Sequence, residues 1–289
     1  MGAAFVITLR EGIEAALIVS IILAYLNSIG RGDRRGVVWT GTGLAAGVSL
    51  AVGAVIFLTA GTLSERAEEA FEGVATLVAV GVLTWMIFWM ARQARSIKGH
   101  LQSQVSTALA TGSGLALGAL AFVVVVREGL ETALFLFATL RATTEGSIAL
   151  GYVGAALGLG TAFLLGYLIY RGGVRLNLRT FFRVTGALVL VIAAGLLAYG
   201  IHELQEVGWI AGASAKAFDI SGALSDQGGL GGILRALFGY NADPSWLELG
   251  AWATYLAVVG SLFFRRPRAP RVVAAEPQAA APVETGDRA

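Results

Sequence analysis

The sequence predicts an all-α membrane protein with seven transmembrane helices, and three features of the chain indicate this fold class. Of its 289 residues, 56% are hydrophobic and 14% are charged, which is too apolar for an ordinary soluble domain. The apolar residues form runs near the length of about 20 residues that a helix needs to cross the hydrocarbon core. Basic residues gather in alternate loops. We therefore expect a multi-pass protein of the cytoplasmic membrane, embedded in the lipid bilayer.

The whole chain is assigned to seven predicted spans, the connections between them and a C-terminal tail. The spans cover residues 3–27, 37–62, 71–92, 110–140, 147–170, 181–201 and 246–264. The first span lacks the leader and cleavage site of a secretory signal, so we expect it to be retained. Residues 202–245 form a long extracytoplasmic connection with a weak amphipathic pattern over 209–220. The Pro- and Ala-rich residues 265–289 predict a disordered cytosolic tail.

The basic residues predict the orientation of the spans. The loops around 28–36, 92–100 and 171–183, together with the tail, hold 15 of the 21 Lys and Arg residues. The positive-inside rule then places the N-terminus outside and the C-terminus inside. Since the basic residues follow this loop pattern, the isoelectric point near 9.1 does not indicate binding to nucleic acid.

The remaining residues of the spans predict helix packing and exclude several kinds of site. Glycines spaced four apart, which let helices approach closely, predict three packing faces: Gly43 with Gly47, Gly114 with Gly118, and Gly154 with Gly158. We interpret the aromatic and methionine residues of 85–90 as an aromatic belt with packing and assign them no chemical role. Cysteine is absent and there are two histidines, so a thiolate or zinc site is hard to build. No haem or phosphate-binding motif appears, and we expect no resident cofactor.

A charged pentapeptide occurs twice within the predicted spans, as Arg10-Glu11-Gly12-Ile13-Glu14 and Arg127-Glu128-Gly129-Leu130-Glu131. Ionisable side chains at bilayer depth are costly and commonly mark ion pathways. On a helix, the arginine and both glutamates of each copy fall within an arc of about 100°, with the glycine behind. Two facing arcs would gather four carboxylates and two guanidiniums, and a hard multivalent cation would balance the remaining negative charge.

The second motif lies three spans after the first, in the fourth span, so it runs in the opposite direction through the membrane. We therefore expect an inverted repeat of residues 1–108 and 109–201, with the site near the midplane between the repeats. The structural alternative is that each arginine only neutralises the glutamate four residues later. That pairing would leave one glutamate of each copy without a partner.

Acidic residues also gather at the predicted outer ends of spans three and six. Glu65, Glu68, Glu69 and Glu72 follow helical spacing, and His202, Glu203 and Glu206 lie on the same side of the membrane. We expect Glu68, Glu69, Glu72, His202, Glu203 and Glu206 to form an outer vestibule that concentrates cations. The alternative is a solvated helix end.

The doubled motif, the seven spans, the outside N-terminus and the segments Phe71-Glu72-Gly73 and His202-Glu203-Leu204-Gln205-Glu206 together resemble the oxidase-dependent iron transporter family. This family includes fungal high-affinity iron permeases and the bacterial Efe-type permease subunit. The resemblance implies that Glu11, Glu14, Glu128 and Glu131 bind the transported iron, with Arg10 and Arg127 balancing charge. It also implies a periplasmic partner that delivers or oxidises iron.

The sequence thus predicts a permease that imports iron ions and is not an enzyme, and three other functions compete with it. Lead-transporting relatives share the glutamate signature, so another metal remains an alternative. A membrane-embedded carboxylate metalloenzyme would normally add a histidine three residues after a glutamate, and neither His100 nor His202 holds that position. A proton-coupled carrier of an organic ion would use the glutamates as proton relays.

Overall fold

A computed structural model describes residues 1–93, 97–110, 114–143, 148–171, 177–226 and 229–265. The described chain is almost entirely helical. Its elements are α1 (Gly2–Ser28), the 3-10 helix η1 (Gly32–Arg34), α2 (Arg35–Ala60), α3 (Glu65–Gln93), α4 (Ile97–Ala110), α5 (Gly114–Arg141), α6 (Ile148–Tyr170), α7 (Leu178–Glu206), α8 (Gly229–Phe238) and α9 (Trp246–Phe264). The predicted tail lies outside the described residues from 266 onward.

A helix covers each of the seven predicted spans. Five segments are long and apolar enough to cross a membrane: Gly32–Ala60, Glu65–Met90, Ile148–Tyr170, Thr180–Glu206 and Trp246–Phe264. The two other long helices, α1 and α5, each carry the three charged residues of the repeated motif. The all-helical class is confirmed, and the two motif helices carry their charged residues in the middle of otherwise apolar sequence.

The structure differs from the sequence prediction in two short helices. The 14-residue helix α4 was not predicted because its apolar residues form no long run; Leu101 and Val105 are buried in a cluster with Ile22 and Leu26 of α1. The weak amphipathic pattern at 209–220 does not correspond to a helix. This segment is irregular, with its Ala217 N–H donating to Pro244 O, and the helix of the connection is α8 instead.

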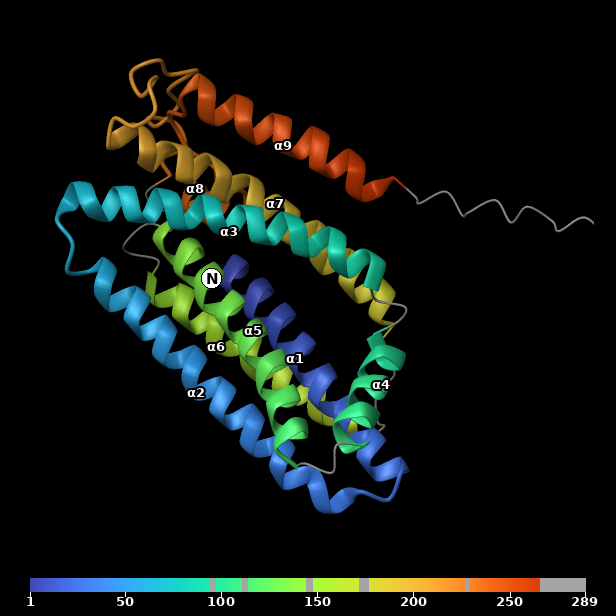
Figure 1. Ribbon diagram of the computed structural model, residues 1–289. Coiled ribbons are helices and arrows are strands. Elements are labelled where there is room, and N and C mark those ends of the chain that lie inside the picture. Colours follow the sequence, from blue (N-terminus) through green and yellow to red (C-terminus); the bar gives the residue numbers. More distant parts are fainter. Residues whose placement is uncertain (94–96, 111–113, 144–147, 172–176, 227–228, 266–289) are drawn as a thin grey trace, which may run out of the picture.

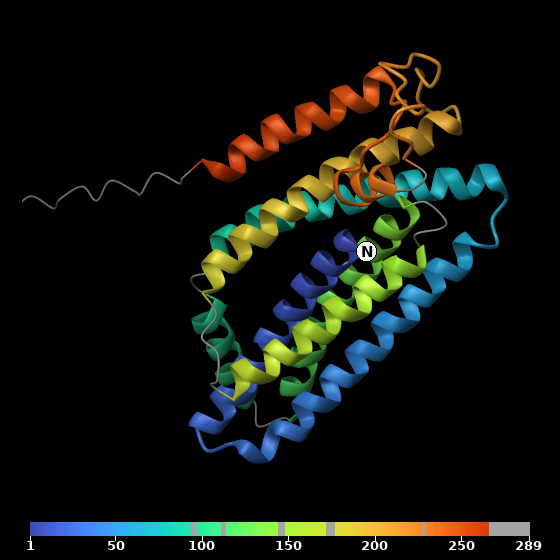
Figure 2. The same ribbon diagram turned by 180° about the vertical axis from the view of Figure 1, so that it is seen from behind.

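The helices pair in a regular way (Figure 1). α1 packs along α6, α2 packs along α5, and α3 packs along α7, with α9 on the outer side of α7. α1 and α5 also contact each other. Seen from behind, α6 covers α1 on one side, while α3 and α7 form a separate pair on the other (Figure 2). α1 is therefore enclosed by other helices over most of its length.

Two of the three predicted glycine faces are confirmed as close helix contacts. Gly154 and Gly158 meet the backbone of α1, and Gly114 and Gly118 meet residues at the start of α2. The Gly43 and Gly47 face is wrong, since no described atom outside their own turn lies within 4 Å of a Cβ placed at either position. Gly41 makes the close contact of α2 instead, against Gly118. Spacing alone does not tell which side of a helix faces a neighbour.

Candidate metal centre

The two copies of the charged motif lie on α1 and α5, and their glycines are the points of close contact behind them. A Cβ added at Gly12 would lie 2.6 Å from Ala162 Cβ of α6, and one added at Gly129 would lie 2.6 Å from Ser49 Cβ of α2. Each motif helix is thus held from behind by the second helix of the other half of the chain. These contacts fix the position of the charged side chains on the opposite face.

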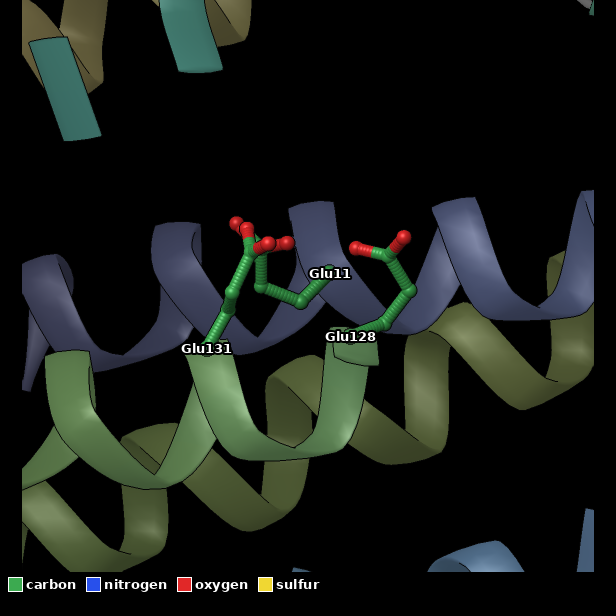
Figure 3. A group of neighbouring side chains, drawn as sticks. All are labelled: Glu11, Glu128 and Glu131. Carbon is green, nitrogen blue, oxygen red and sulfur yellow. The ribbon is translucent and has the colours of Figure 1, made fainter. Parts of the chain in front are cut away.

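Three of the motif carboxylates converge. Glu11, Glu128 and Glu131 each offer one carboxylate oxygen, and these oxygens all lie within 4.8 Å of one another. Figure 3 shows Glu11 reaching from α1 towards Glu131 of α5, with the Glu128 carboxylate turned to the same side. Glu11 is 1% exposed and Glu128 is 5% exposed. The group is therefore a buried acidic centre between the two motif helices.

Arg10 neutralises the α1 copy of the motif. Its Nη1 donates a 2.8 Å hydrogen bond to Glu11 Oε1, and its Nη2 lies 3.1 Å from Glu14 Oε1. Arg10 is only 1% exposed, so both ion pairs are shielded from solvent. Glu14 is held by Arg10 and is the one predicted ligand outside the group of converging carboxylates.

Arg127 engages the α5 copy differently. Its Nε donates a 2.8 Å hydrogen bond to Glu131 Oε1, and its side chain is 37% exposed. Glu128 forms no ion pair with any residue in the described part of the chain. The α5 copy therefore contributes a buried carboxylate without a cationic partner.

Several oxygens of the acidic centre are left without hydrogen bonds. Glu11 Oε2, Glu128 Oε2 and Glu131 Oε2 are buried and accept no hydrogen bond from the described residues. Leaving a buried acceptor unsatisfied costs about 1 to 3 kcal/mol, and more for a charged group. Clustered carboxylate oxygens of this kind suit hard cations. The converging glutamates are thus able to hold a metal ion.

Apolar side chains separate this centre from both ends of α5. Val125 lies in the apolar cluster that includes Leu26 and Leu117. Phe135, on the other side of the motif, belongs to a second cluster with Ile7 and Leu83. An ion held between these clusters would have to exchange its water ligands for the carboxylates.

The predicted outer acids do not form one open group. Glu72 is buried, and Arg141 Nη1 lies 2.7 Å from both Glu72 Oε1 and Glu68 Oε1. Tyr199 donates a 2.8 Å hydrogen bond to Glu72 Oε2. Glu69 and Glu203 are half-buried, whereas Glu206 is exposed. Arg141 thus neutralises part of the acidic run, a pairing between residues that lie 69 and 73 positions apart, which helical spacing does not reveal.

His202 lies beside a buried carboxylate of α9. Its Nδ1 is 3.2 Å from Glu248 Oε1, and Asn241 donates a 3.0 Å hydrogen bond to Glu248 Oε2. These residues line a cavity of about 360 Å³ between α5, α7, α8 and the start of α9, as does Tyr199. The cavity is separate from the converging glutamates, none of which lines it. Glu248 carries no signal in the sequence, because a single acid at a helix start is common.

Residues of α3 that were predicted to have no chemical role contact both motif arginines. Met86 Sδ accepts a 3.0 Å hydrogen bond from Arg10 Nη1. The Arg127 guanidinium lies over the rings of Trp85 and Trp89. The segment thus packs against the motif arginines themselves. The sequence shows the tryptophans and methionine of this segment, but it does not show which residues of other helices they contact.

Comparisons with known proteins agree on one family. Residues 1–270 match the iron permease FTR1 family. The chain is 42% identical over 267 residues to ferrous iron permease EfeU of Escherichia coli O6:K15:H31 (strain 536 / UPEC), covering 92% of this chain and 96% of that protein. It is also 42% identical over 267 residues to ferrous iron permease EfeU of Yersinia pestis, with coverages of 91% and 93%. No solved structure matches the chain. The protein belongs to the iron permease FTR1 family.

Proposed function

We propose that this protein is a permease of the cell membrane that imports iron ions through a site built from Glu11, Glu14, Glu128 and Glu131. The single observation that carries the proposal is the group of buried carboxylate oxygens from α1 and α5 within 4.8 Å of one another. Four glutamates and two arginines leave a formal charge of −2, which a divalent cation balances. The name ferrous iron permease, carried by the relatives, favours Fe(II) as the ion.

Glu14 completes the site when the ion arrives. It lies on the same helix as Glu11 and is held by a 3.1 Å contact to Arg10. Its Oε1 accepts no hydrogen bond of good geometry from the described residues, so the contact is purely electrostatic. A cation bound by Glu11 would repel Arg10 and attract Glu14. Arg10 and Arg127 then serve as charge-balancing residues that keep the empty site stable.

The proposed architecture is a pair of inverted repeats followed by a seventh span. α1 to α3 of residues 1–108 would correspond to α5 to α7 of residues 109–201, with α9 as the last span. The exchanged pairing supports this correspondence, because α1 packs on α6 in the way that α2 packs on α5. Gly12 and Gly129 likewise pack on the second helix of the other repeat. In this proposal the N-terminus lies outside and the C-terminus inside.

Iron would reach the site from the outer acidic residues and leave towards the cytoplasm. Glu68, Glu69, Glu72, His202, Glu203 and Glu206 would attract the ion to the outer end of the bundle. A periplasmic partner protein that delivers or oxidises iron would supply it there. A membrane potential contributes about 2.3 kcal/mol per charge per 100 mV, hence about 4.6 kcal/mol for a divalent ion moving inward. No resident cofactor is needed.

The decisive experiment measures radio-iron uptake into proteoliposomes that contain the purified protein. We expect Glu11→Gln, Glu128→Gln and Glu131→Gln each to reduce uptake more than tenfold, because each removes a charged ligand. Glu14→Gln should reduce the maximal rate. Asp219→Asn, which changes an exposed acid of the 202–245 connection, is the matched control and should transport normally. Normal flux in all four glutamate variants would reject the proposal.

Competing ions and gradients separate the iron permease from the other candidates. An excess of lead or manganese that suppresses iron uptake completely would indicate a permease for another metal. Uptake of an organic ion driven by a pH gradient without metal would indicate a proton-coupled carrier. Turnover of a redox substrate without flux would indicate a metalloenzyme; in the structure, however, the metal-binding group contains only glutamates among the described residues.

A further inference from the structure

One turn of α3 touches an arginine from each copy of the motif. The guanidinium carbon of Arg127 lies 4.8 Å from the ring centroid of Trp89 and 5.4 Å from that of Trp85. The two indoles stack with their centroids 5.9 Å apart and an angle of 23° between their planes. Both distances fall within the range of about 6 Å in which a guanidinium is attracted to an aromatic face. The two indoles therefore form a stacked aromatic surface that contacts Arg127.

The neighbouring residue Met86 contacts the other arginine. Its sulfur accepts a 3.0 Å hydrogen bond from Arg10 Nη1, and its side chain is fully buried. The same Nη1 donates to Glu11 Oε1 at 2.8 Å. α3 thus contacts Arg127 through two tryptophans and Arg10 through Met86, all within little more than one helical turn.

Each arginine is in turn bonded to one glutamate of the converging group. Arg127 holds Glu131 Oε1, and Arg10 holds Glu11 Oε1. The second oxygen of each of these carboxylates is buried without a hydrogen-bond donor from the described residues. The orientation of each free oxygen therefore depends on where its arginine is held.

Arg127 needs this support more than Arg10 does. Arg10 is 1% exposed and is packed on all sides, whereas the side chain of Arg127 is 37% exposed. A flexible, partly exposed arginine has many rotamers, and ordering it costs conformational entropy. A planar guanidinium stacked on indole faces loses that freedom. The aromatic surface consequently restricts Arg127 and, through it, Glu131.

We propose that Trp85 and Trp89 are positioning residues of the metal site, which act through Arg127 to orient the Glu131 carboxylate. Met86 acts in the same way through Arg10 on Glu11. The inference rests on the proposed transport function for its effect on iron, but the contact to Arg127 can be tested without transport. If the indoles only filled space or anchored the helix, any apolar side chain of similar size would replace them.

Iron uptake tests the effect of this contact on the site. We expect Trp89→Leu to raise the iron concentration for half-maximal uptake by about three- to thirtyfold, the range that corresponds to loss of a cation–π contact. The maximal rate should change less than twofold. Trp89→Phe keeps an aromatic face and should restore most of the affinity. Trp39→Leu, at an exposed tryptophan of α2, is the matched control and should behave as wild type.

An equal loss of affinity in the leucine and phenylalanine variants would overturn the proposal, because shape and not the aromatic face would then matter. A loss confined to the maximal rate would also overturn it. Met86→Leu retains the volume but removes the sulfur acceptor. It should raise the half-maximal concentration by about two- to threefold, a smaller effect because Arg10 keeps both of its glutamates.

A second measurement separates this inference from the transport function. Thermal unfolding of the metal-free protein in detergent is compared for wild type, Trp89→Leu, Arg127→Gln and the double variant. We expect Trp89→Leu to lower the unfolding temperature by about 2 to 4 °C less in the Arg127→Gln background than in the wild type. Identical shifts of the unfolding temperature in both backgrounds would show that Trp89 does not act through Arg127 and would overturn the proposal. If the wild type takes up no iron, the proposed function is rejected. The difference between the two backgrounds in the unfolding temperature still shows whether the indoles hold Arg127.

Discussion

The two copies of one pentapeptide occupy different environments in the folded chain. In α1, Arg10 is completely buried and contacts both glutamates of its own copy. In α5, Arg127 is partly exposed and pairs with Glu131 alone, so Glu128 has no cationic partner among the described residues. The same residues, with the same formal charge in each copy, therefore give an enclosed half in which the arginine contacts both glutamates and a partly open half in which it pairs with one.

This difference indicates a division of roles between the copies. The α1 copy resembles a structural ion-pair cluster, in which removal of the arginine would strand two carboxylates. The α5 copy supplies the unbalanced charge that attracts a cation. The structural alternative considered for both motifs thus describes much of the α1 copy and little of the α5 copy. Variants that are matched across the two copies show whether the division holds.

The largest difference is expected when the arginines are removed. Arg10→Met should lower the free energy of unfolding by about 3 to 5 kcal/mol, the usual cost of breaking a buried ion pair. Arg127→Met should cost less, about 1 to 2 kcal/mol, because this residue is partly exposed and loses a single ion pair, to Glu131, together with its contacts to the two tryptophans. Chemical unfolding in detergent micelles without metal measures both values. Equal losses would show that the two copies are equivalent.

The motif glycines should give nearly equal effects, because they make equivalent contacts. Gly12→Ala and Gly129→Ala each introduce a methyl group that overlaps Ala162 or Ser49, and overpacking of this kind costs about 1 to 3 kcal/mol. A second substitution that shortens the neighbour, Ala162→Gly or Ser49→Gly, should recover part of the loss. Thermal unfolding of the single and double variants measures the recovery. A cost at only one glycine would weaken the case for an inverted repeat.

Removal of the unpaired acid should have a smaller effect on stability and the opposite sign. Glu128→Gln replaces a buried carboxylate that has no ion pair with a neutral amide, so the metal-free protein should become more stable by about 1 kcal/mol. Glu14→Gln removes a partner of Arg10 and should destabilise it. Unfolding midpoints of the two variants at neutral pH test this contrast. Destabilisation by Glu128→Gln would mean that Glu128 has a structural partner after all.

The end of α5 that carries Arg141 should show the smallest effect. Arg141→Gln removes the ion pairs to Glu68 and Glu72; the side chains of Arg141 and Glu68 are 26% and 30% exposed, and the buried Glu72 keeps its hydrogen bond from Tyr199. Ion pairs this close to solvent contribute about 0 to 1 kcal/mol. We expect a stability loss below 1 kcal/mol together with faster uptake at low iron concentration, because two acids are released. Slower uptake would show that Arg141 is needed to organise the outer end.

The sequence by itself determined the features that depend on local periodicity and composition. Apolar runs predicted every long helix of the described chain, and helical spacing placed Arg10, Glu11 and Glu14 on one arc and Gly12 behind. The repeat predicted that α1 and α5 carry related sites. These properties follow from the geometry of a single helix and from the cost of burying charge, and neither requires knowledge of neighbouring helices.

The tertiary structure alone decided which groups meet. It brought Glu11, Glu128 and Glu131 together, left Glu14 on Arg10, and gave Arg141 to Glu68 and Glu72. It also set Trp85, Met86 and Trp89 against the motif arginines and turned Gly43 and Gly47 away from any described neighbour. Periodicity tells which residues share a face of a helix. The partner of that face depends on the rotation and crossing of whole helices, which are set by packing over the entire bundle.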